Sequence, residues 1–203
     1  MTESADEADR AASRPPRFPT TRIWLVSVGE LEDESYVPDF SGHSDPALSS
    51  RGKQQATATA EELALHGAPP VAAVYASPLA SAQTAAALVA GSLGLEGFET
   101  APALATVMPE TLPPGRSGIE TLAMIQDYAW SHVEVVKLLH EPDVSVVFVS
   151  HELPIRALVC KALSIPLEES DRFQVQPGSL SAIEFRGPRT ILALLNDLCH
   201  LDA

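Results

Sequence analysis

The stretch VVFVSHELPIRAL, residues Val146–Leu158, decides how the rest of the chain is interpreted. Its first half is an unbroken apolar run rich in β-branched residues, which is typical of a strand covered on both faces of a parallel sheet. His151 then precedes a segment in which Pro154 is tolerated, because a proline in the first turn of a helix loses no hydrogen bond. The stretch therefore predicts a buried strand, then His151, then a helix.

Working outward, two more apolar runs have the same character, and helical patterns separate them. The first helical pattern is an Ala- and Gln-rich segment. Ser49 is a suitable N-cap for it, and Gly67 is placed to end it. Alternation of strands and helices predicts right-handed crossovers in an α/β fold, a three-layer doubly wound and mostly parallel sheet. The predicted strands are Ile23–Val28, Val71–Tyr75 and Val144–Val149, and the predicted helices are Ser49–His66, Leu79–Leu93, Gly118–His140 and Pro154–Leu163.

The two ends of the chain complete this organisation. Residues 1–20 are charged, rich in Ala, Ser and Pro, and too poor in large apolar side chains to offset the entropy of ordering, so they are predicted to be a disordered tail. Residues 21–203 then form one domain, as the length of 203 residues allows. Near the other end, Ser179–Phe185 and Thr190–Leu195 flank Gly187-Pro188 and predict a β-hairpin that finishes the sheet.

The net charge, apolar runs and cysteines of the chain limit which partners and which cellular location are expected. The net charge of -14 repels polyanions, so nucleic acid is not expected as a partner. No apolar run approaches the roughly 18 residues that span a bilayer, which predicts a cytoplasmic protein with no membrane partner. Cys160 and Cys199 lie in apolar segments and predict two buried free thiols. A homodimer is compatible with the sequence and is left open.

At the predicted strand ends the sequence resembles the histidine phosphatase, or phosphoglycerate-mutase-like, superfamily. Six blocks carry the resemblance, and they occur in the family's order. They are TRIWLVSVGE (Thr21–Glu30), DPALSSRGKQQA (Asp45–Ala56), VYASPLASAQTA (Val74–Ala85), VVFVSHELPIRAL (Val146–Leu158), PGSLSAIEF (Pro177–Phe185) and LLNDLCHL (Leu194–Leu201).

The resemblance also implies a site, and this sequence departs from it. In the family, a His after the first strand attacks phosphorus and two Arg side chains clamp the phosphoryl oxygens. Carried over by position, the nucleophile falls on Val28 and the first Arg on Ser27, while the second Arg falls on Ser81 or, in the alternative register, on Ala80. None of these residues is His or Arg, so the chain is predicted to be a degenerate member that lacks the Arg-His-Gly motif.

Other residues of the implied site are retained or ambiguous. His151 matches the family's second histidine and is the predicted acid/base, with Glu110 as the counterpart of the family's acid. Glu30 and Glu152 are expected to place negative charge at the rim of the pocket. His43 is expected to approach it if its loop folds over the site.

Three functional hypotheses follow. The first is a pocket repurposed to bind, and in its enzymatic version transform, a non-phosphorylated small molecule that is neutral or cationic, with His151 as acid/base. The second is a non-catalytic pseudophosphatase that binds a metabolite or a protein partner, and the third is a residual phosphatase with another nucleophile such as His43. Whether the chain is an enzyme stays open at this point. No Gly-rich phosphate loop and no metal-binding spacing is present, so no cofactor and no metal are expected.

Overall fold

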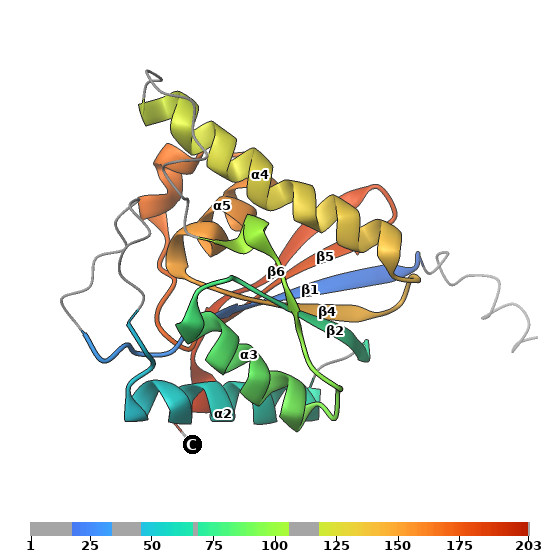
Figure 1. Cartoon of the computed structure of the whole chain (residues 1–203). Coiled ribbons are helices and arrows are strands. Elements are labelled where there is room, and N and C mark those ends of the chain that lie inside the picture. Colours follow the sequence, from blue (N-terminus) through green and yellow to red (C-terminus); the bar gives the residue numbers. More distant parts are fainter. Residues whose placement is uncertain (1–17, 34–45, 67–68, 106–117, 203) are drawn as a thin grey trace, which may run out of the picture.

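The computed structural model describes residues 18–33, 46–66, 69–105 and 118–202. They form a mixed α/β fold around one six-stranded sheet with the order β3-β2-β4-β1-β5-β6 (Figure 1). The strands are β1 (Thr20–Ser27), β2 (Val71–Ala76), β3 (Glu99–Thr100), β4 (Ser145–Ser150), β5 (Leu180–Arg186) and β6 (Arg189–Asp197).

The three predicted apolar strands form the centre of this sheet. β4 pairs in parallel with β1 on one side and with β2 on the other, so the prediction of adjacent parallel strands is confirmed. β1 begins at Thr20, one residue before the predicted start of the domain. Phe18 and Pro19 precede β1 among the described residues, and residues 1–17 of the predicted tail lie outside them.

The predicted hairpin is also confirmed, and β3 is an addition. β5 pairs antiparallel with β1 and β6, and Gly187 in the connecting turn has a φ of +57°, a conformation that glycine adopts without strain. The two-residue strand β3 pairs in parallel with Tyr75 and Ala76 of β2. Its two residues, Glu99 and Thr100, carry no apolar pattern, so periodicity does not predict this strand.

Helices cover both faces of the sheet, which completes the three layers (Figure 1). The Ser49 hydroxyl accepts a hydrogen bond from the Gly52 N–H at 3.0 Å, which confirms Ser49 as an N-cap. Among the described helices, none is long and apolar enough to cross a membrane. One face carries α2 (Ser50–His66) and α3 (Ala80–Ser92), and the other carries α4 (Gly118–Leu139) and α5 (Glu152–Ala162).

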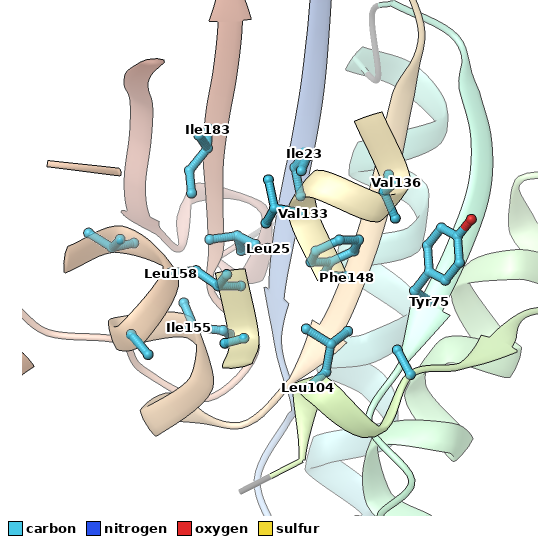
Figure 2. Close-up of a cluster of buried hydrophobic side chains, with 14 of the residues drawn as sticks. Ile23, Leu25, Tyr75, Leu104, Val133, Val136, Phe148, Ile155, Leu158 and Ile183 are labelled. Atoms are coloured by element: carbon cyan, nitrogen blue, oxygen red, sulfur yellow. The ribbon is translucent and has the colours of Figure 1, made fainter. Parts of the chain in front are cut away.

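Alternating side chains of the central strands supply the two halves of the core. Ile23 and Leu25 of β1 pack with Phe148 of β4 under α4 and α5, as Figure 2 shows. Trp24 and Val26 point to the opposite face, toward the alanine-rich surfaces of α2 and α3. Both faces are buried, and this explains why the strands read as continuous apolar runs.

Candidate active site

A pocket of about 280 Å³ lies at the carboxyl ends of β1 and β4. The two strands are in register to their last residues, with Ser27 opposite Ser150, and the Val28 N–H then donates to the Ser150 carbonyl at 2.9 Å. This edge of an open parallel sheet is where ligands bind in doubly wound folds. The pocket is lined by Ser27, Val28, Gly29, Glu30, Leu31, Asp33, His151, Glu152, Val175 and Pro177.

Five of the residues singled out from the sequence line this pocket, namely Ser27, Val28, Glu30, His151 and Glu152. Ser27, Val28 and His151 form its buried part, with only 4, 6 and 4% of their surface exposed. The predicted His43 and Glu110 lie outside the described residues.

Ser81 lies beside the imidazole of His151. The Ser81 Oγ and His151 Nε2 atoms are 3.0 Å apart, and Ser81 is fully buried. Ala80, the alternative register for this position, is exposed and is not part of this contact. Ser81 is the second residue of α3 and His151 is the N-cap of α5, so two helix starts converge here.

Close packing of glycines positions the loop after β1. A Cβ atom on Gly29 would overlap the backbone of Gly52, and one on Gly52 would overlap the Glu30 carbonyl. The Glu30 N–H donates to Gln55 Oε1 at 2.8 Å, and the Ser49 hydroxyl donates to the Glu30 carboxylate at 2.8 Å. The start of α2 therefore holds Glu30 at the rim of the pocket.

The two predicted rim carboxylates both have an arginine partner. Glu30 is 3.7 Å from the exposed guanidinium of Arg51. Glu152 forms an ion pair with Arg156, whose guanidinium also donates to the Ser170 carbonyl at 2.7 Å. These pairs offset part of the negative charge, but the described residues that line the pocket include no Arg or Lys.

Neither cysteine lines this pocket, and the described residues form no metal-binding group. Cys160 is buried, and burial raises the pKa of its thiol to about 11. The prediction that Cys199 is buried is wrong, because the chain leaves β6 at Asp197 and Cys199 starts an exposed turn. Within the described ranges, no group of three or more His, Cys, Asp or Glu side chains is arranged to hold a metal ion.

Residues 23–108 and 100–198 match the histidine phosphatase superfamily (branch 1). The chain belongs to this superfamily. Phosphoserine phosphatase 1 of Hydrogenobacter thermophilus is 30% identical over 88% of this chain and 94% of its own length.

Solved structures agree on the fold of this histidine phosphatase superfamily member. YhfR of Bacillus stearothermophilus has a TM-score of 0.73 at 20% identity, over 89% of this chain and 99% of its own. A mutant phosphoserine phosphatase from Entamoeba histolytica, in complex with phosphoserine, has a TM-score of 0.68 at 20% identity over the same shares.

The comparisons contradict the functional hypothesis drawn from the sequence. That hypothesis favoured a site repurposed for a non-phosphorylated ligand, with a non-catalytic pseudophosphatase as its alternative. The relative with 30% identity is named phosphoserine phosphatase 1, and solved structures with the same fold are also named phosphatases, which speaks against both versions of that hypothesis. The hypothesis relied on the substituted positions Ser27, Val28 and Ser81, and it did not foresee that Ser81 contacts the retained His151.

Sequence reasoning also missed part of the pocket wall. Val175 and Pro177 reach it because the Gly178 N–H donates to the Val28 carbonyl at 3.1 Å, which docks the segment before β5 against the end of β1. Gly178 has a φ of +75°, which explains a glycine at this turn. The Pro-Gly-Ser signal was present in the sequence, but its partner on β1 was not predictable from spacing.

Proposed function

We propose that this chain hydrolyses phosphate monoesters in the pocket formed by Ser27, Val28 and His151. The observation that carries the proposal is the buried contact between Ser81 and His151, with Oγ and Nε2 3.0 Å apart, because His151 lines that pocket. The phosphatase names of the relatives support the same reaction class.

The proposed reaction has to proceed without the family's Arg-His-Gly motif after the first strand. Ser27-Val28-Gly29 stands where the family has Arg-His-Gly, and the side chain of Val28 has no lone pair that attacks phosphorus. Water then serves as the nucleophile, and His151 is the group in the pocket that exchanges protons with it. Ser81 acts as a positioning residue, because its hydroxyl fixes the orientation of the imidazole.

The reaction balances with one imidazole. The oxygen of water attacks phosphorus while His151 accepts a proton from that water. The ester P–O bond breaks on the opposite side of phosphorus, where the departing alkoxide takes a proton from solvent, and the imidazolium afterwards releases its proton to solvent. The products are the alcohol and inorganic phosphate.

Backbone groups and a hydroxyl are the stabilisers of the phosphoryl oxygens. The N–H groups of Glu152 and Leu153 lie in the first turn of α5, where no intrahelical acceptor exists, and helix starts favour anions. Ser27 adds a hydroxyl at the pocket floor. A hydrogen bond to a charged group contributes about 1.5–3 kcal/mol, so a pocket without guanidinium groups should bind phosphate weakly and have a high KM.

The test is phosphate release from O-phosphoserine and p-nitrophenyl phosphate by the full chain. His151→Gln should lower kcat about 10²–10⁴-fold, the range for a general acid/base. Ser81→Ala should lower kcat with KM unchanged. Matched controls are His140→Gln and Ser92→Ala, which lie outside the pocket and should retain activity. No release above the uncatalysed rate, or full activity of His151→Gln, would overturn the proposal.

A further inference from the structure

A second, larger cavity of about 610 Å³ opens beside the reaction pocket. It lies between the first half of α2 and the C-terminal 3-10 turn η4 (Cys199–Leu201). Glu30 and Pro177 line both the cavity and the reaction pocket, so the two spaces adjoin. A molecule that reacts beside His151 can therefore extend into this cavity.

Hydrogen-bond contacts connect the segments that form the wall of the cavity between α2 and η4. His200 of η4 places its Nε2 atom 3.0 Å from both the Thr59 hydroxyl of α2 and the Gly178 carbonyl. On the other side, Gln55 accepts the Glu30 N–H, as described above. These contacts link three segments that are distant in the sequence. The tertiary structure therefore fixes the walls of the cavity.

Hydrogen-bond donors and acceptors are mixed along this wall. The amides of Gln54, Gln55 and Gln176 and the guanidinium of Arg51 supply donors, and the same amides with the carboxylates of Glu30 and Asp202 supply acceptors. Alcohol hydroxyls both donate and accept, so several hydroxyls on one ligand match such a wall. The apolar remainder, which includes Ala58, Leu198 and Leu201, suits the C–H faces of the same kind of molecule.

Other ligand classes fit less well. Two carboxylates against one guanidinium disfavour a second phosphate group or an acidic ligand. The described wall has no Phe, Tyr or Trp for stacking a nucleobase. A cavity of this volume is within the usual range of ligand sites and is much larger than the side chain of a single small amino acid requires.

We infer that this cavity holds the alcohol part of the substrate and that this part is polyhydroxylated, as in a sugar or sugar alcohol phosphate. The inference rests on the proposed function, because it places the leaving group of the same reaction. The hydrolysed phosphate sits beside His151, and the hydroxyl-bearing chain or ring crosses Glu30 into the cavity.

The experiment compares glucose 6-phosphate with p-nitrophenyl phosphate, which has no hydroxyl groups. Ala58→Phe narrows the cavity, and Ala64→Phe places the same ring on the exposed surface of α2. Ala58→Phe should lower kcat/KM for glucose 6-phosphate about tenfold and change that for p-nitrophenyl phosphate less than about twofold, while Ala64→Phe should change neither. Asp202→Asn should reproduce the selective loss to a smaller extent, with the exposed Asp171→Asn as its control.

The outcomes separate this inference from the proposed function. Equal losses on both substrates, or no loss with Ala58→Phe, would overturn the leaving-group site while leaving phosphatase activity intact. If neither ester is hydrolysed, the proposed function fails. Calorimetric titration with sorbitol 6-phosphate then tests whether the cavity binds a polyol. Binding to wild type that Ala58→Phe abolishes supports a polyol site, and absence of binding to wild type overturns it.

Discussion

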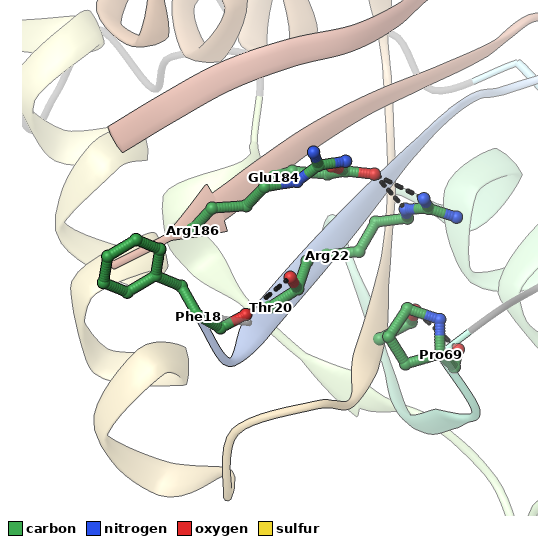
Figure 3. A network of polar contacts seen from close by, with 7 residues as sticks. Phe18, Thr20, Arg22, Pro69, Glu184 and Arg186 are labelled. Atoms are coloured by element: carbon green, nitrogen blue, oxygen red, sulfur yellow. Dashed lines mark hydrogen bonds and ion pairs between the residues drawn. The ribbon is translucent and has the colours of Figure 1, made fainter. Parts of the chain in front are cut away.

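The two ends of strand β1 differ in their charged side chains. At the amino end, Arg22 and Arg186 both pair with the buried carboxylate of Glu184, and Arg22 Nε donates to Glu184 Oε1 at 2.9 Å (Figure 3). At the carboxyl end, Ser27 and Val28 form an uncharged floor beside His151. Guanidinium groups therefore stabilise the fold at one end of the strand, whereas the reaction proposed for the other end depends on one imidazole.

Glu184 is ionised because of its partners. Burial by itself would raise the pKa of this carboxyl group, but hydrogen bonds from Arg22 and Arg186, together with their charges, outweigh burial and lower it. Only 1% of the Glu184 side chain is exposed, so an arginine that is removed leaves a buried charge with fewer partners.

The largest expected effect comes from breaking the charged end. Arg22→Met should lower the free energy of unfolding by about 3 kcal/mol, the low end for a broken buried ion pair, because Arg186 remains. Arg186→Met should cost less, since that side chain is 53% exposed against 22% for Arg22. Urea denaturation measures both. Phosphate release should persist in both variants, and an Arg22→Met protein as stable as wild type would contradict the role of this pair.

The next effect comes from adding charge to the uncharged end. Ser27→Arg introduces a guanidinium at the pocket floor, and a hydrogen bond to a charged group contributes about 1.5–3 kcal/mol, so vanadate should inhibit about tenfold more tightly or better. Ser27→Met supplies a long side chain without charge and serves as the control. Equal inhibition of the two variants would show that charge does not limit oxyanion binding here.

The smallest effect is a pH dependence at the charged end. Because the folded-state pKa of Glu184 is lowered, its stabilising contribution is complete above the unfolded value of 4.5 and is lost as the pH falls through the folded value. Glu184→Gln should therefore show a shallower loss of stability below about pH 4.5 than wild type, whatever its absolute stability. Parallel acid limbs in the two proteins would be inconsistent with an ionised, arginine-paired Glu184.

Prediction from sequence succeeded where local pattern and tertiary structure agree. The strand predicted over Val144–Val149 is β4 (Ser145–Ser150), which is largely apolar because both faces are covered, and His151 follows it and lines the pocket. It failed where neighbours in space are remote in the chain. The contact between Thr59 and His200 joins residues 141 apart, so nothing in either segment signals the larger cavity.

The predicted function failed for a related reason. The substitutions at Ser27 and Val28 are visible in the sequence, but the burial of Ser81 against His151 requires α3 and β4 to be docked. Spacing alone left Ala80 and Ser81 as alternatives, and only the packed helix start distinguishes the buried serine from the exposed alanine.

Chemical rescue tests most directly whether the imidazole of His151 carries the reaction. His151→Ala leaves space next to a pocket of about 280 Å³, which exogenous imidazole can enter. The measurement is phosphate release from p-nitrophenyl phosphate by this variant as the imidazole concentration rises, with His140→Ala as the control. The account predicts a low rate for His151→Ala that imidazole raises to a plateau, and no response in the control. Wild-type activity of His151→Ala in the absence of imidazole would contradict it.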